Sequence, residues 1–319
     1  MENKPIIKYL KDFLDYSEIE KGLSLKTQEN YSRFLNKFFN YLKNSNLQDL
    51  KPQDLNEDHV WKYRLFLSRH INKVSNRPLK KSTQNYYLIA LRSLLEFFVE
   101  KNINSLPPSK IKLAKDRSER EIKFLNLDQL KKLLSSPDDN DIKGLRDRSI
   151  LETLFSTGLR VSELVALNRD QIKIKNNLEF LEISVVGKGQ KVRTVYFSER
   201  ALSAIKKYLD KRNDIDPALF INYKPGIEKT GESRRLTTKS IETIVKKYIK
   251  ITGLPVMATP HTLRHSFATD LMSQGVDLRL VQEFLGHKNI ATTQVYTHVT
   301  SKQLGDIHKK IHSRKNFDK

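Results

Sequence analysis

Large apolar side chains recur every three or four positions through the first hundred residues, and this spacing favours helices over strands. Residues three, four and seven apart share one face of a helix, so such residues can be buried together. Short polar joints divide the pattern into four runs, which predict four amphipathic helices. Their apolar members are Ile6, Ile7, Leu10, Phe13 and Leu14; Tyr31, Phe34, Leu35, Phe38, Phe39 and Leu42; Trp61, Leu65 and Phe66; and Tyr86, Leu88, Leu91, Leu94, Leu95 and Phe98.

Four such helices predict a compact helical bundle, with the aromatic side chains in its core instead of stacked on bases. Ser24 and Thr27 are both suited to cap the second helix, and the fourth helix is expected to start after Ser82.

The helical pattern stops near residue 104. Residues 106–122 contain a Pro pair, many charges and few large apolar side chains, which is typical of a solvated linker. A basic linker could also follow a DNA backbone. We therefore expect a helical DNA-binding domain at residues 1–105, a linker at 106–122 and a second domain at 123–319.

The second domain mixes two periodicities. Residues 127–134 and 144–167 predict helices, with Asp128 near the start of the first. Residues 178–186 and 191–197 alternate β-branched and aromatic residues over short stretches, and Gly187 to Gln190 between them suit a hairpin turn. The expected fold class is mainly α, with a helical bundle followed by a mostly helical domain that contains a small antiparallel sheet.

Charge narrows the class of partner. The 319 residues include 58 Lys and Arg against 37 Asp and Glu, a net charge of +21. The excess is +8 in residues 1–122 and +13 in the rest, so both halves could contact phosphate, as a clamp around DNA would. A strongly basic chain favours polyanions, nucleic acid before membrane. Charge alone also fits a generic basic protein, such as one associated with ribosomes.

The expected cellular location depends on three features that the sequence does not show: cysteines, a signal peptide and a membrane-spanning run. There is no Cys, which excludes disulfides and Cys-based zinc sites. The first residues alternate charged and apolar side chains, unlike a signal peptide, and no apolar run reaches the roughly 20 residues that span a bilayer. We expect a soluble cytoplasmic protein with no membrane partner.

Four short segments of the second domain carry the chemistry. They are Thr157–Leu164 (TGLRVSEL), Val186–Gly189 (VGKG), Pro260–Thr269 (PHTLRHSFAT), and Leu285–His287 (LGH) with Tyr296 nine residues beyond. In order and spacing they resemble the catalytic domain of tyrosine recombinases of the phage integrase type, most of all the Xer recombinases. The resemblance covers residues 123–300, whereas the first domain is similar in kind but carries no specific signature.

The resemblance implies a catalytic set of six residues: Arg160, Lys188, His261, Arg264, His287 and the nucleophile Tyr296. In such a set, Tyr296 attacks phosphorus and displaces the deoxyribose 5′-oxygen, leaving a 3′-phosphotyrosine. Two guanidiniums brace the charge that grows on the phosphate oxygens. Lys188 gives a proton to the leaving oxygen, His261 assists proton transfer, and His287 positions phosphate or Tyr296. With two Arg in place no metal or other cofactor is expected.

Each of these residues has a simpler alternative. Arg160 could form a surface ion pair with Glu163, three residues on. Lys188 could be an exposed turn lysine, and Lys191 could take its place as the acid. A lone Tyr is usually core or surface, and His265 and His298 match no catalytic position of the family. DNA could be read by exposed faces of the first-domain helices, or by helices near Arg234, Arg235 and Lys239.

The predicted function is site-specific DNA recombination, of the Xer type that resolves dimers during chromosome partition and cell division. The alternatives are integration of a mobile element, topoisomerase activity by the same chemistry, and a DNA-binding protein without catalysis. The resemblance implies a homo- or hetero-tetramer on two DNA duplexes, with an accessory cell-division protein as a further partner. Leu304, Ile307 and Ile311 predict a C-terminal amphipathic helix that docks on the neighbouring subunit or on its own domain.

Overall fold

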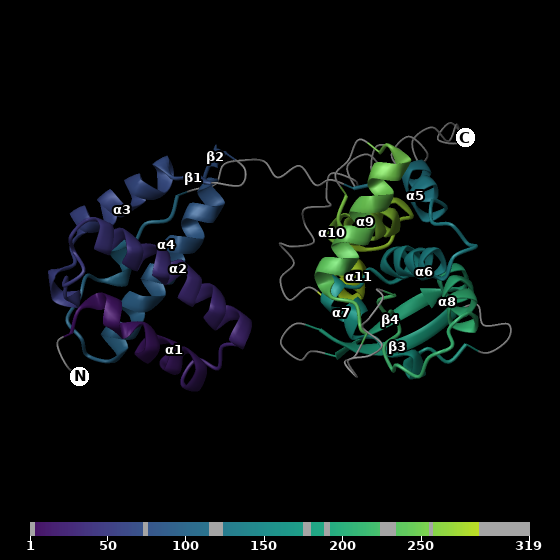
Figure 1. Cartoon of the computed structure of the whole chain (residues 1–319), viewed down its shortest axis with the longest axis horizontal. Coiled ribbons are helices and arrows are strands. Elements are labelled where there is room, and N and C mark those ends of the chain that lie inside the picture. The colour runs from purple at the N-terminus through teal and green to yellow at the C-terminus, as the bar shows by residue number, and fades with distance from the viewer. Residues whose placement is uncertain are drawn as a thin grey trace, which may run out of the picture. The chain divides into compact units, whose positions relative to one another are not determined.

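The computed structural model describes residues 4–72, 76–114, 124–174, 180–187, 192–223, 234–254 and 258–286. The chain divides into two compact units, Met1–Glu119 and Arg120–Lys319 (Figure 1). The division falls within the predicted linker at 106–122, of which residues 115–122 lie outside the described part of the chain. The boundaries expected from the sequence stay a prediction.

The first unit is helical, as predicted. Its α-helices are α1 (Leu10–Ile19), α2 (Leu25–Asn44), α3 (Glu57–Arg69) and α4 (Lys81–Glu100), with 3₁₀ turns at Ile6–Tyr9, Pro52–Asp54 and Pro108–Lys110. Between α3 and α4 lies a pair of two-residue antiparallel strands, β1 (Ile71–Asn72) and β2 (Arg77–Pro78), which the sequence analysis did not predict. Two-residue strands are too short to leave an alternating pattern in the sequence.

The aromatic side chains of this unit mostly form its core, as expected. Phe13, Phe38, Phe97 and Phe98 are at most 1% exposed, and several meet edge to face. The exceptions among the predicted aromatic residues are Trp61 and Tyr86, which are 61% and 57% exposed. The prediction placed the apolar face of α3 one position off.

Residues Val60, Tyr63 and Leu67, at i, i+3 and i+7, form the buried face of α3 instead. Helix α4 begins earlier than expected: it starts at Lys81, so Ser82 lies inside it. Helix α2 begins directly after Ser24, one of its two predicted caps.

The second unit is mostly helical around one small sheet. Its elements are α5 (Leu127–Leu134), α6 (Ile142–Thr157), α7 (Val161–Ala166), a 3₁₀ turn at Arg169–Gln171, β3 (Phe180–Val186), β4 (Val192–Ser198), α8 (Glu199–Asp210), α9 (Thr238–Thr252), α10 (Pro260–Ser273) and α11 (Leu278–Leu285). The fold class predicted from the sequence is confirmed.

The single helix expected over residues 144–167 was wrong. The structure divides it into α6 and α7, because Gly158 adopts φ 58° and ends α6 with a left-handed residue. Helix α7 then starts afresh, with Arg160 as its extended N-cap residue. The break brings Arg160 to the beginning of a helix instead of its middle.

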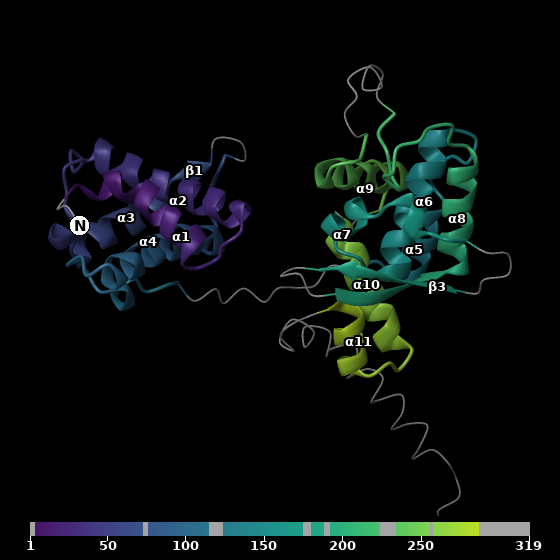
Figure 2. The same ribbon diagram turned by 90° about the horizontal axis from the view of Figure 1, so that it is seen from below.

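Strands β3 and β4 pair antiparallel, from Phe180 opposite Ser198 to Val186 opposite Val192. The register puts Leu181, Ile183 and Val185 on one face with Val195 and Phe197, and this face joins the core with α6 and α8. Helix α11 lies on the other side of the sheet (Figure 2). The turn predicted at Gly187 to Gln190 lies largely outside the described residues.

Burial in this unit is divided between two clusters. The larger unites α5 to α9 and the sheet. A separate small cluster consists of Ala268, Met272, Val281 and Leu285, contributed by α10 and α11. Helix α11 is thus packed mainly on α10 and not into the main core. No helix in the described ranges is long and apolar enough to cross a membrane.

The glycine that ends α6 gives a stability prediction with an internal control. Gly158 and Gly253 both end helices with φ near 60°, so Ala at either should lose about 1–2 kcal/mol of unfolding free energy. A Cβ at Gly158 would meet the Phe267 ring at 2.5 Å, whereas one at Gly253 meets nothing within 4 Å. We expect Gly158→Ala to lose about 1–3 kcal/mol more than Gly253→Ala in urea unfolding followed by circular dichroism. Equal losses of unfolding free energy in the two variants would show that the Phe267 ring adds no steric cost at position 158.

Candidate active site

Arg160 stands at the first turn of α7, held by Glu163. Its backbone N–H donates to Glu163 Oε2 at 2.7 Å, and its Nη1 donates to Oε1 at 2.9 Å. The ion pair between Arg160 and Glu163, the simpler alternative for Arg160, therefore exists. It is not a surface pair, because the Glu163 side chain is 3% exposed. The Nη2 of Arg160 donates to the Gly286 carbonyl at 3.1 Å.

Arg264 comes from the first half of α10. Thr259 caps this helix, Pro260 takes its first position, and His261 lies one turn before Arg264. The Arg264 side chain is buried, and its two terminal nitrogens donate to the carbonyls of Gly158 and Leu285.

Arg160 and Arg264 therefore meet at the end of α11, where they bind the adjacent carbonyls of Gly286 and Leu285. Each guanidinium carries five donors in a rigid plane, so these bonds fix the orientation of both planes. Two fixed guanidiniums suit a tetrahedral anion, and phosphate is the common one in biology. The structure brings these two predicted site residues together.

Glu163 links Arg160 to Arg193 on β4. Arg193 donates to both carboxylate oxygens, at 2.8 and 2.9 Å, and to the Phe284 carbonyl at 3.2 Å. Burial alone would raise the pKa of Glu163, but the hydrogen bonds from Arg193 and Arg160 outweigh burial and hold it below its usual value. The carboxylate therefore stays ionised near neutral pH and keeps both arginines in place.

The histidines of α10 differ in environment. His261 is exposed. His265 is half-buried, and burial, with help from His261 and Arg264, lowers its pKa. His265 is therefore largely neutral at physiological pH.

The other three predicted residues, Lys188, His287 and Tyr296, lie outside the described residues. Their assignment stays a prediction. Lys188 belongs to the segment that joins β3 to β4, and Gly286, next to His287, is the last described residue before the C-terminal segment.

Sequence reasoning missed Arg193. A usable signal was present: Arg193 alternates in phase with Val195 and Phe197, on the buried side of β4. A charged residue in a core register requires an ionised partner, because an unpaired buried charge is very unfavourable. Glu163 was noticed, but only as an alternative explanation for Arg160.

Two basic residues of the region suggested for DNA reading have partners within the protein. Arg235 donates to the carbonyls of Val165 and Leu167, and Arg234 pairs with Asp214 at 3.0 Å. Lys239 is different, with a side chain that is 76% exposed.

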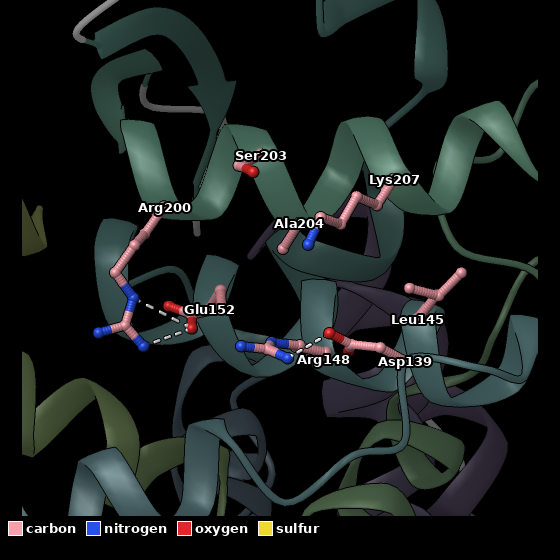
Figure 3. A pocket seen from close by; sticks show the side chains of 8 residues that line it. All are labelled: Asp139, Leu145, Arg148, Glu152, Arg200, Ser203, Ala204 and Lys207. Carbon is pink, nitrogen blue, oxygen red and sulfur yellow. Dashed lines mark hydrogen bonds and ion pairs between the residues drawn. The ribbon is translucent and has the colours of Figure 1, made fainter.

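A separate charged cavity of about 110 Å³ lies between α6 and α8 (Figure 3). Arg200 faces Glu152 there, at 2.6 Å, and Arg148 faces Asp139 at 2.5 Å. Each arginine of this cavity has its own carboxylate, whereas at the end of α11 Arg160 and Arg193 share Glu163, so the cavity is the weaker candidate for an anion.

Comparison with known proteins extends the resemblance to the whole chain. Residues 123–303 match the phage integrase family, and residues 10–102 match its N-terminal SAM-like domain. The chain is 36% identical to tyrosine recombinase XerD of Listeria innocua, covering 95% of this chain and 98% of that protein. It is 34% identical to tyrosine recombinase XerC of Thermodesulfovibrio yellowstonii, over 95% of this chain and 96% of that protein.

Solved structures agree. XerH site-specific recombinase, bound to a palindromic difH substrate after cleavage, matches with a TM-score of 0.69 and 26% identity, over 95% of this chain and 84% of that chain. The Tn1549 transposon integrase in complex with circular intermediate DNA shares the fold, with a TM-score of 0.68 and 17% identity, over 94% and 99% of the two chains. The chain therefore belongs to the phage integrase family, the family of the tyrosine recombinases.

Proposed function

We propose that this chain is a site-specific recombinase that cuts and rejoins duplex DNA through a covalent 3′-phosphotyrosine. The observation that carries the proposal is the meeting of Arg160 and Arg264 on the adjacent carbonyls of Gly286 and Leu285. Gly286 directly precedes His287 in the sequence and stands ten residues before Tyr296. The kinship with recombinases over nearly the full length supports the same activity.

In the proposed reaction, Arg160 and Arg264 bind the non-bridging oxygens of the scissile phosphate and stabilise the charge that builds during attack. A free phenol has a pKa of about 10, so Tyr296 needs this cationic setting and a proton acceptor, the role proposed for His261. The bond from Tyr296 Oη to phosphorus forms as the bond to the 5′-oxygen breaks. Lys188 protonates that oxygen, and His287 orients the phosphate.

The phosphotyrosine ester keeps the free energy of the broken bond, so a 5′-hydroxyl can reseal the strand without ATP. A hydroxyl from a second duplex gives recombination, and the original hydroxyl gives relaxation. We propose that the chain resolves chromosome dimers in the cytoplasm, assisted by a cell-division protein, as its resemblance to the Xer recombinases implies. The fold shared with a transposon integrase keeps integration of a mobile element as the second candidate.

Recombination between two duplexes needs four active sites, and we propose a tetramer closed by head-to-tail contacts. An apolar hollow of about 410 Å³ lies beside the exposed face of the sheet, lined in part by Phe180, Tyr196, Phe267 and Phe284. Phe180 and Tyr196 are 54% and 40% exposed. An amphipathic helix over residues 301–319 of a neighbouring copy would cover such a surface.

The nucleophile is tested by trapping the covalent product on a nicked duplex, in EDTA. Genomic DNA near the gene and near the replication terminus is screened for the site. We expect an adduct with the parent protein and none with Tyr296→Phe, because only the phenol oxygen can form the ester. Tyr196→Phe, which removes an exposed hydroxyl of the same unit, should leave the adduct unchanged. An adduct formed by Tyr296→Phe would disprove this assignment.

Affinity for DNA should depend steeply on salt, because basic residues of both units release counterions from the phosphates. If six or more phosphates are contacted, affinity should fall about 10³-fold between 50 and 200 mM salt. Filter binding or fluorescence anisotropy on a duplex that contains the site measures this dependence. An affinity that hardly changes over this range would contradict a clamp made by both units.

The assembly is tested by deleting residues 301–319. The truncated protein should bind one isolated site normally and lose recombination between two sites, since it lacks the proposed contact with its neighbour. As a finer pair, Ile307→Asp should act like the deletion, while Lys309→Asp, on a polar position, should recombine normally. Equal recombination by the truncated and parent proteins would disprove the docking proposal.

A further inference from the structure

Arg193 is an arginine that the six-residue set does not include. It is the second residue of β4, and its side chain is only 10% exposed. All the donors resolved for it point into the protein, to Glu163 and to the carbonyl of Phe284. It is therefore placed to act on other side chains and not on DNA.

Three successive carbonyls, the last two of α11 and that of its cap residue, each accept a hydrogen bond from a different arginine. Phe284 accepts from Arg193, Leu285 from Arg264 and Gly286 from Arg160. Carbonyls at a helix C-terminus have no partner within the helix and carry the negative end of its dipole, so cations stabilise them. This group of three arginines fixes the point from which the chain continues to His287.

Contact at this point is close. A Cβ added to Gly286 would lie 2.7 Å from the Cδ of Arg193. The side chain of Arg193 thus lies directly against the turn that ends α11, and it contributes shape as well as charge.

Glu163 connects Arg193 to Arg160. Its Oε1 accepts from the Nη1 atoms of both arginines, and its Oε2 accepts from Arg193 Nη2 and from the backbone of Arg160. A carboxylate prefers two parallel bonds from one guanidinium, and here Arg193 provides them. As long as it does, Arg160 makes a single side-chain bond to Glu163 and its remaining donors stay available.

We propose that Arg193 is a positioning residue for DNA cleavage: it occupies Glu163 with two parallel bonds, so that the Arg160 guanidinium is presented to the scissile phosphate. Without Arg193, the buried carboxylate captures the Arg160 guanidinium more fully and turns its donors away. This inference rests on the proposed role of Arg160 at the phosphate. Arg193 makes no contact with the phosphate itself.

The test uses the full-length protein and the nicked duplex selected in the adduct assay, under single-turnover conditions with saturating protein. We expect Arg193→Met to slow cleavage at least about 30-fold and to change the Kd for DNA less than threefold, because it alters the orientation of Arg160 and not the charge facing DNA. Arg193→Lys, which keeps the charge but cannot make two parallel bonds, should still be slowed about tenfold.

A matched control is available in the same unit. Arg200 also pairs with a buried carboxylate, Glu152, but it lies outside the arginine group at α11. Arg200→Met removes the partner of a carboxylate as buried as Glu163, although the Arg200 side chain is itself 61% exposed, and should cleave within threefold of the parent. If Arg200→Met is slowed as much as Arg193→Met, the effect is a general loss of structure and the proposal is wrong.

A substrate with a neutral scissile group distinguishes positioning from folding. A methylphosphonate replaces one non-bridging oxygen by methyl and so carries less charge for Arg160 to brace. If Arg193 acts through Arg160, the loss caused by Arg193→Met should shrink at least about tenfold on this substrate. If Arg193→Met slows cleavage of both substrates by the same factor, the proposal is overturned. This comparison holds even if the variant has a lowered melting temperature, because both substrates are cleaved by the same protein.

The result also separates this inference from the proposed function. If Arg193→Met cleaves the phosphodiester like the parent while Tyr296→Phe is inactive, only the role of Arg193 is refuted. An adduct that persists in Tyr296→Phe refutes the proposed active site, whatever the Arg193 variants do.

Discussion

The candidate active site depends on one buried carboxylate. Glu163 is 3% exposed, yet it remains charged because Arg193 and Arg160 donate to it from two different elements. Removing one partner of a buried ion pair lowers stability strongly, because the charge left behind has neither a partner nor solvent. Replacing the whole pair by apolar residues often costs much less. The start of α7, strand β4 and the end of α11 are therefore tied to each other through hydrogen bonds of defined geometry. Apolar packing could hold these elements together, but it could not fix the plane of a guanidinium.

The broken helix is the second requirement. If residues 144–167 formed one continuous helix, Arg160 would lie in its middle and its backbone N–H would bond within the helix. The left-handed Gly158 ends α6 instead, and its carbonyl becomes free to accept from Arg264. The same turn releases the Arg160 N–H for Glu163. One glycine thus supplies both the geometry of the first arginine and an anchor for the second.

Sequence reasoning predicted what short-range spacing controls. The helices of the first unit and the β3–β4 hairpin follow from apolar periodicity, although Trp61 shows that the buried face of a helix can be misjudged by one position. The glycine that divides α6 from α7 was passed over, because a single Gly is tolerated in many helical patterns.

The site was predicted in a different way. Arg160 and Arg264 were grouped by resemblance to a family, since no local pattern joins residues so far apart in the chain. Their arrangement on the α11 carbonyls could not be foreseen, because it depends on tertiary packing. Arg193 shows what a stricter reading could find: an alternating strand placed a cation in phase with Val195 and Phe197, and such a residue must have a buried partner.

The small cluster of α10 and α11 has a thermodynamic consequence. With only Ala268, Met272, Val281 and Leu285 buried in it, α11 gains little stability from apolar contacts and relies on arginines at its end. In the proposed site, a phosphate that recruits donors from those arginines competes with the α11 carbonyls for them. Ligand binding and local opening of α11 then become linked equilibria, each shifting the other by the same factor. Helix α11 would then open most readily when DNA is bound.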